Sequence, residues 1–296
     1  MEYTTTDWAW PWWSTMVIMN VITFLAGVLL FKKSQNTNFS SYTKKMRILG
    51  LIFVSVALYR SVFVSSYYEQ LAWFDSFANS SLLIRFFALF AELSFAGLFT
   101  LALLKVNKDL PGTPSSQQNI FIKFFLHNVP YFFFACLFIA QFFATSGLVT
   151  KFEVLFAIEE TLWGIAFLSI APLAIAQLRR VLAISDASIK PQYALIKAFT
   201  IMTSVWCVGY GSYSVFYHLS IELWPDVIHN LQHSEIIFKT GFSAISDAAT
   251  IVNQTRNFSD WGGIGFFIWH SGYFSLCVWM VLLLMNGPRL LNNKQT

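Results

Sequence analysis

The chain has 296 residues, of which 56% are hydrophobic and 11% are charged, and its formal net charge at pH 7 is +4. Soluble domains carry about 25% charged residues, so the composition excludes an ordinary soluble protein and predicts a polytopic membrane protein. We expect the lipid bilayer as its surroundings and no nucleic acid as a partner. The three cysteines all lie in apolar stretches, so no loop disulfide is expected.

Seven apolar stretches are each about 20 residues long, enough to cross a hydrocarbon core of about 30 Å as an α-helix. The stretches cover residues 13–31, 48–68, 82–104, 121–143, 155–178, 198–219 and 264–285. The sequence therefore predicts an all-α membrane protein, a seven-transmembrane-helix bundle that forms one polytopic domain over residues 1–296.

Residues 236–252 form a further stretch of about span length, but Lys239 and Asp247 interrupt it. Counting it as an eighth crossing would place the cations of the C-terminal tail on the outer side. We therefore expect an interfacial or re-entrant helix here, with its polar backbone covered by protein or water.

The distribution of Lys and Arg between the loops predicts the orientation. One side of the predicted bundle holds fourteen of these residues and the opposite side holds three, Lys151, Lys239 and Arg256. Cytoplasmic loops of membrane proteins are enriched in Lys and Arg. The N-terminus is therefore predicted outside and the C-terminus in the cytoplasm.

Three charged residues lie inside the second and third apolar stretches: Arg60, Arg85 and Glu92. Each ionised group there costs about 2.5–3.5 kcal/mol or more unless it is paired or hydrated. Arg85 and Glu92 are seven residues apart and hence share one helical face, which we expect to point into the bundle.

Polar residues of other stretches converge on the same predicted outer half, which suggests a hydrated pocket. Its predicted lining is Arg60, Asp75, Arg85, Glu92, Glu159, Glu160 and His270. The alternative is a set of buried ion pairs, Arg60 with Glu92 and Arg85 with Glu159 or Glu160, that only fix helix packing. Intramembrane charge favours the functional interpretation, and two guanidinium groups would suit an anionic or lipid ligand.

A second group of residues has the spacing of metal ligands. His218 and Glu222 are four residues apart, as are His229 and His233, so each pair shares a helical face and can contribute to a transition-metal site. Glu235 is a further ligand in this hypothesis, and the Trp224–Pro225 step is expected to break any helix between the pairs. The alternative is a set of interfacial histidines in a polar outer loop.

A retinal cofactor is not expected. A retinal Schiff base needs a lysine at mid-membrane depth in the last helix, and the seven stretches contain none. Lys239 would qualify only if its own stretch crossed the membrane.

Several short motifs resemble a family of multi-spanning membrane proteins of about this length and of unassigned function. They are Arg60-Ser-Val, Phe74-Asp-Ser, Arg85 with Ala91-Glu-Leu-x-Phe-Ala, Glu159-Glu-x-Leu-Trp, and Tyr273-Phe-Ser with Val278-Trp. The resemblance covers the second, third, fifth and seventh stretches and implies no activity. It does imply that Arg60, Asp75, Arg85, Glu92 and Glu160 belong to one recurring set.

Three classes of function follow from these patterns. The first is ligand binding or transport through an outer-facing polar pocket. The second is an intramembrane enzyme for a lipid or another apolar substrate, with the paired glutamates as general acid or base and a His-bound metal. The third is a structural subunit of a larger membrane complex. The sequence leaves the ligand, the substrate and the oligomeric state open.

Overall fold

The computed structural model describes residues 6–35, 39–66, 70–110, 120–184, 190–233, 237–257, 259–261 and 264–289. These residues fold into two compact units. The first unit comprises Met1–Phe95, Ala144–Phe152 and Ile237–Met285, and the second comprises Ala96–Phe143, Glu153–Ile236 and Asn286–Thr296.

The first unit contains helices from the first and last parts of the chain, together with one end each of α3 and α4. They are α1 (Thr6–Gln35), α2 (Ser41–Val62), the beginning of α3 (Ser81–Asp109), the end of α4 (Ile120–Thr150), and a continuous C-terminal helix of α9 (Ile264–Gly272), η4 (Tyr273–Cys277) and α10 (Val278–Leu284). The Ser40 hydroxyl begins α2 by accepting a hydrogen bond from the Thr43 backbone N–H at 3.3 Å, which satisfies a free donor of the first turn.

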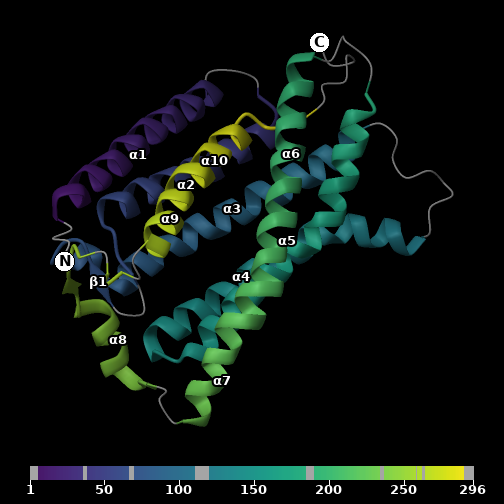
Figure 1. The fold of residues 1–296 in the computed structure, drawn as a ribbon. Coiled ribbons are helices and arrows are strands. Elements are labelled where there is room, and N and C mark those ends of the chain that lie inside the picture. Colours follow the sequence, from purple (N-terminus) through teal and green to yellow (C-terminus); the bar gives the residue numbers. More distant parts are fainter. Residues whose placement is uncertain are drawn as a thin grey trace. The chain divides into compact units, whose positions relative to one another are not determined.

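Helices α1, α2 and α9–α10 lie side by side in this unit (Figure 1). At one end, the Trp13 indole of α1 donates to the Val62 carbonyl, the last residue of α2, at 3.1 Å. At the other end, Arg47 of α2 donates to the Met285 carbonyl that follows α10. Helix α2 therefore runs antiparallel to both of its neighbours.

The loop after α2 is extended where the sequence predicted helix. Helix α2 ends at Val62, although the predicted second span reached residue 68. Ser65 then forms an antiparallel bridge with Ala72, and β1 (Leu71–Ala72) pairs in parallel with β2 (Asn253–Gln254). Phe63 and Val64, which follow Val62, suit an extended chain as well as a helix, so hydrophobicity alone does not locate the helix end.

The described part of residues 236–252, which excludes Ile236, does not cross as a helix. It contains α8 (Gly241–Thr250), whose 10 residues span about 15 Å, half of a hydrocarbon core. Lys239 and Asp247, which interrupt the apolar pattern, form an ion pair with each other. Gln70 donates to the Asp247 carbonyl at 2.8 Å, which fixes α8 to the loop between α2 and the short 3-10 helix η1 (Phe77–Asn79).

The second unit contains α5 (Glu153–Leu182), α6 (Lys190–Tyr213), η3 (Ser214–Leu223) and α7 (Trp224–Gln232), with the remaining parts of α3 and α4. Its core is aromatic: the Phe167 ring lies 5.2 Å from Phe133 and 6.4 Å from Phe99. All three rings are buried, so they join α3, α4 and α5 through one cluster.

The predicted helix break at Trp224–Pro225 is wrong, because one helical stretch continues from Tyr193 to Gln232. Segment η3 has π-helical hydrogen bonding, with the Trp224 N–H donating to the Leu219 carbonyl five residues earlier. A proline in an α-helix removes one hydrogen bond and clashes with the carbonyl four residues before it. The wider π turn just before Pro225 avoids this conflict.

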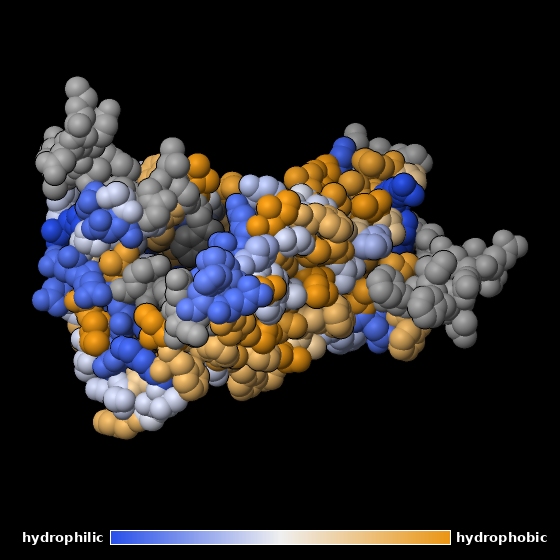
Figure 2. Space-filling model, turned by 60° about the horizontal axis from the view of Figure 1, so that its bottom comes forward, coloured by the Kyte–Doolittle hydropathy of each residue, from blue (hydrophilic) through white to orange (hydrophobic). Residues whose placement is uncertain are grey.

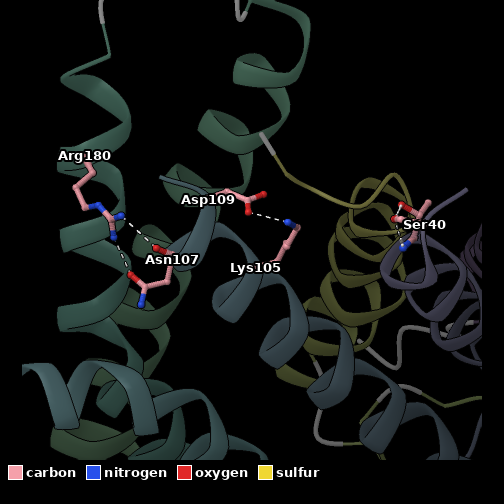
Figure 3. Close-up of polar contacts among 6 residues, drawn as sticks. Ser40, Lys105, Asn107, Asp109 and Arg180 are labelled. Atoms are coloured by element: carbon pink, nitrogen blue, oxygen red, sulfur yellow. Dashed lines mark hydrogen bonds and ion pairs between the residues drawn. The ribbon is translucent and has the colours of Figure 1, made fainter. Parts of the chain in front are cut away.

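A side-chain cap ends α3 in the second unit (Figure 3). The Arg180 guanidinium of α5 donates to the Asn107 side chain at 2.7 Å and to the Asn107 carbonyl at 3.1 Å, and it also reaches the Leu110 carbonyl. Lys105 and Asp109 pair at 2.7 Å on the same turn. Because the last carbonyls of a helix lack intrahelical partners and carry partial negative charge, a cation here stabilises the helix end.

Six helical stretches among the described residues are long and apolar enough to cross a membrane. They are Ala9–Gln35, Ser81–Asp109, Leu126–Thr150, Glu153–Leu182, Tyr193–Gln232 and Phe266–Leu284. Broad hydrophobic areas are exposed on the face shown in Figure 2. On α1, Ile18, Ile22, Leu25 and Leu29 form one stripe, each more than half exposed.

These features fit an all-α integral membrane protein. Seven spans are not confirmed, because α2 is not among the six. Its uncharged stretch between Arg47 and Arg60 has 12 residues, or about 18 Å of helix.

Candidate functional site

Glu92 forms a buried ion pair with Arg85 on its own helix, α3. The Arg85 Nη1 and Nη2 atoms donate to Glu92 Oε1 and Oε2 at 3.1 and 3.2 Å, and the two side chains are 3% and 10% exposed. Seven residues are about 10.5 Å apart along a helix axis, so the two side chains extend along α3 toward each other. A bidentate guanidinium–carboxylate pair is among the stronger polar contacts in proteins.

The Arg85–Glu92 ion pair agrees with one prediction from the sequence and differs from another. The shared face of Arg85 and Glu92 is as predicted. The alternative of purely structural ion pairs gave Glu92 to Arg60 and Arg85 to a glutamate of the fifth span, whereas the structure joins Arg85 and Glu92 directly.

Arg60 lies near the C-terminal end of α2 and is 6% exposed. Its Cζ atom lies 5.4 Å from the centre of the Phe274 ring and 5.7 Å from that of Tyr273. A guanidinium within about 6 Å of an aromatic face is attracted by the negative π surface, more strongly where water is absent. Tyr273 and Phe274 were not predicted as site residues, although both belong to the Tyr273-Phe-Ser motif.

His270 lies one turn before Phe274 and is 2% exposed. Its ring is 4.3 Å from the Phe274 ring and 5.2 Å from the Trp12 ring, and it is close enough to Arg60 for an electrostatic interaction. The predicted site residues Arg60 and His270 are therefore brought together, through the aromatic side chains between them.

The two groups of polar residues lie on helical segments that contact one another through Phe53. Phe53 of α2 contacts both Phe95 of α3, at 5.8 Å, and Tyr273 of η4, at 6.2 Å. Arg60 lies seven residues after Phe53, and Glu92 three residues before Phe95, so each shares a helical face with its phenylalanine. We call Arg60, Arg85, Glu92 and His270 the polar layer.

The helix that carries Tyr273 and Phe274 is widened at this point. Segment η4 (Tyr273–Cys277) has π-helical hydrogen bonding between α-helical segments on both sides. Such one-turn widenings cost helix stability and occur frequently at functional sites. Here the π turn lies where the two rings contact Arg60.

Aromatic residues cover the polar layer at the end where α1 begins. The Trp73 ring, next to β1, lies 5.7 Å from Trp12 of α1 and 6.4 Å from Trp261. Trp12 in turn donates from its indole nitrogen to the Ser271 hydroxyl at 2.9 Å. The pairing of β1 with β2 holds these segments together, so this aromatic cap depends on residues almost 200 positions apart in sequence.

The remaining predicted pocket residues are on other elements. Asp75 is exposed on the loop between β1 and η1, whereas Glu159 and Glu160 are half-buried on α5, in the second unit.

Of the predicted metal ligands, His218 and Glu222 lie on η3, His229 lies on α7, and His233 directly follows α7. His218 Nδ1 is 3.1 Å from Glu222 Oε2, and the rings of His229 and His233 are 4.1 Å apart. His233 Nδ1 is 2.8 Å from the His229 carbonyl, which occupies one of its ring nitrogens. Glu235 lies outside the described residues, and among those described no group of three or more His, Cys, Asp or Glu side chains could hold a metal ion.

Comparisons with known proteins add no information about function. No family model, no curated protein and no solved structure matches the chain.

Proposed function

We propose that the chain is a seven-helix integral membrane protein that binds an anionic ligand at the polar layer. The observation that carries the proposal is the burial of two guanidinium groups in the first unit, Arg85 in an ion pair with Glu92 and Arg60 against the Tyr273 and Phe274 rings. Guanidinium groups suit the planar, bidentate binding of carboxylate and phosphate groups.

The seventh crossing in this proposal is α2. It lies along α1 and α9–α10 over their length, from Arg47 beside Met285 to Val62 beside Trp13. Both neighbours are long and apolar enough to cross a membrane, so a helix that covers the same length crosses with them. The cations at the start of α2 reach the headgroup region by extending their side chains.

The polar layer is proposed to lie in the outer half of the membrane. This orientation rests on the excess of Lys and Arg in the loops of the opposite side. The aromatic cap then lies at the outer interface, where tryptophan is enriched.

Labelling of introduced cysteines tests this topology. In intact cells, an impermeant maleimide should label Ser76→Cys directly and Ser40→Cys only after permeabilisation. The native cysteines Cys136, Cys207 and Cys277 are buried, so background labelling should be low. Labelling of both introduced cysteines from the same side would refute the seven-span arrangement.

Anion binding is tested with butyrate and inorganic phosphate as probes, by titrating the purified protein in mild detergent and following thermal unfolding. At least one of the two anions should raise the unfolding temperature. A charge-assisted hydrogen bond contributes about 1.5–3 kcal/mol, so Arg60→Gln should weaken binding about 10- to 100-fold, and Arg60→Lys should retain part of it.

The exposed Arg179 of α5 provides a matched control. Arg179→Gln removes the same charge outside the polar layer and should leave the titration unchanged. If neither anion stabilises the wild-type protein, or if Arg60→Gln and Arg179→Gln behave alike, the polar layer is not an anion site.

A further inference from the structure

A cavity of about 390 Å³ lies in the first unit at the beginning of α3. Its wall is formed mostly by η1 and the first turns of α3, and Thr145 of α4 and Ala249 of α8 complete it. The volume is at the lower end of the range of about 300–1,000 Å³ typical of ligand sites. The cavity is therefore large enough for a segment of a hydrocarbon chain.

The accessible surface inside this cavity is almost wholly apolar, with Phe77, Leu82 and Leu89 among the side chains that line it. Arg85 borders the cavity, but its guanidinium is buried in the ion pair with Glu92. Apolar cavities in proteins stay free of water and take up apolar molecules instead. The wall therefore favours an uncharged hydrocarbon as the occupant.

The depth of the cavity follows from the ends of two helices that are long and apolar enough to cross a membrane, α3 and α4. The backbone N–H of Lys239, just before α8, donates to the carbonyl of Thr150, the last residue of α4, at 2.7 Å. Thr145 lies five residues before Thr150, or about 7.5 Å along the helix axis. The cavity thus lies inward of the helix end, at the level of the upper part of the acyl chains.

The rim of the cavity is continuous with an exposed apolar face of α3. Phe77 and Phe86 both line the cavity and are 67% and 55% exposed. Phe90, one turn after Phe86, is also exposed. On a helix that crosses a membrane such side chains face lipid, whose chains are as apolar as leucine, so acyl chains reach the opening of the cavity without passing through water.

Helix α8 supports the same position. Ala244 and Ala248 form its buried side, whereas Phe242 and Ile245 are exposed. A short helix with one apolar exposed side lies in the membrane interface with that side about 5–10 Å deep, at the boundary between headgroups and acyl chains. Because Ala249 of α8 belongs to the wall, bilayer lipid lies next to the cavity.

We infer that this cavity holds part of an acyl chain of a membrane phospholipid, which enters sideways from the bilayer. The inference rests on α3 and α4 crossing the membrane and goes beyond the proposed anion site. An acyl chain gives the wall the van der Waals contacts that an empty space lacks. The headgroup of the same lipid stays in the headgroup layer beside α8.

The probe for this inference is phosphatidylcholine with a diazirine in the middle of one acyl chain, photolysed in nanodiscs that contain the wild-type protein. Leu82 and Thr145 line the cavity and are half-buried, whereas Ile18 and Leu29 of α1 are more than half exposed. The cavity residues should nevertheless give at least as many adducts as the α1 residues. Simple partition into the bilayer would instead give adducts in proportion to exposure, and that result would overturn the inference.

Two variants of α3 provide the second measurement. Leu89→Trp should fill the cavity and lower the adducts at Leu82 and Thr145 at least tenfold. Phe90→Trp is the matched control, because Phe90 neighbours Leu89 but does not line the cavity, and it should leave these adducts unchanged. Both variants should leave the adducts on α1 unchanged. Equal effects of the two variants at Leu82 and Thr145 would refute a chain inside the cavity.

Native mass spectrometry in mild detergent distinguishes the source of the occupant. A retained mass equal to that of a phospholipid, lost in Leu89→Trp and kept in Phe90→Trp, supports the inference. A retained apolar molecule that is not a phospholipid, together with no adducts at Leu82 and Thr145, overturns it. Neither butyrate nor phosphate enters these measurements, so the anion site and the acyl-chain cavity can fail independently.

Discussion

The close approach of α5 and α6 in the second unit predicts opposite responses of two glycines on the same helix. A Cβ atom added at Gly211 would lie 2.8 Å from the backbone nitrogen of Leu168 and 3.0 Å from its Cα. Backbone atoms cannot rotate away as a side chain does, so Gly211→Ala must separate the two helices. A Cβ atom at Gly209 would meet nothing within 4 Å.

The difference between the two variants isolates the packing cost. Alanine is favoured over glycine in a helix by about 0.8–1.0 kcal/mol at both positions, and this gain cancels in the comparison. Insertion of a methyl group into a closely packed interface costs about 1–3 kcal/mol. Gly211→Ala should therefore be about 1–3 kcal/mol less stable than Gly209→Ala.

Reversible unfolding by a denaturing detergent measures this difference, with loss of helical circular dichroism as the signal. Both variants should be compared with wild type at the same ratio of denaturing to mild detergent. Equal stability of Gly209→Ala and Gly211→Ala within about 0.5 kcal/mol, the scatter expected of neutral changes, would refute the close approach of α5 and α6 at Gly211.

Two further predictions concern the first unit. Gly50→Ala would place a Cβ atom 2.1 Å from the Met285 side chain, so it should lower the thermal unfolding temperature. Adding Met285→Ala to the same chain should recover part of this loss, whereas additive losses would exclude the contact. Arg85→Gln should lower the free energy of unfolding by about 3–5 kcal/mol, because it leaves the buried Glu92 charge without its Arg85 partner. The double variant Arg85→Gln with Glu92→Gln should lose less stability in the same assay, whereas a larger loss would contradict the ion pair.

The sequence predicted most of the long helices because they depend on one property. A stretch of about 20 apolar residues reports only whether a helix can avoid water, and α1, α3, α4 and α5 each contain their predicted span. The errors lie where local geometry decides. Val62 ends α2 because residues 64–66 pair with residues 71–73 a few positions later. The helix continues through Pro225 because the turn before it is π-helical.

The polar layer was predictable in its members but not in its contacts. Arg60, Arg85, Glu92 and His270 were all chosen from charge or polarity inside apolar stretches. The partner of each depends on how far a long side chain extends along its helix, as Arg85 and Glu92 show. The contacts of Tyr273 and Phe274 with Arg60 depend on packing between helices, which no periodicity reports.

The arrangement of the polar layer also bears on why two arginines are retained. Each ionised arginine at membrane depth costs about 2.5–3.5 kcal/mol, and the Arg85–Glu92 pair compensates that cost for one of them. Arg60 gains contacts with the Tyr273 and Phe274 rings, and such contacts contribute about 0.5–2 kcal/mol. Helix packing alone would be served as well by an apolar residue at position 60, since apolar replacements of buried charges are often neutral or stabilising. If Arg60 belongs to the proposed anion site, Arg60→Leu should therefore give a protein at least as stable as wild type that no longer responds to butyrate.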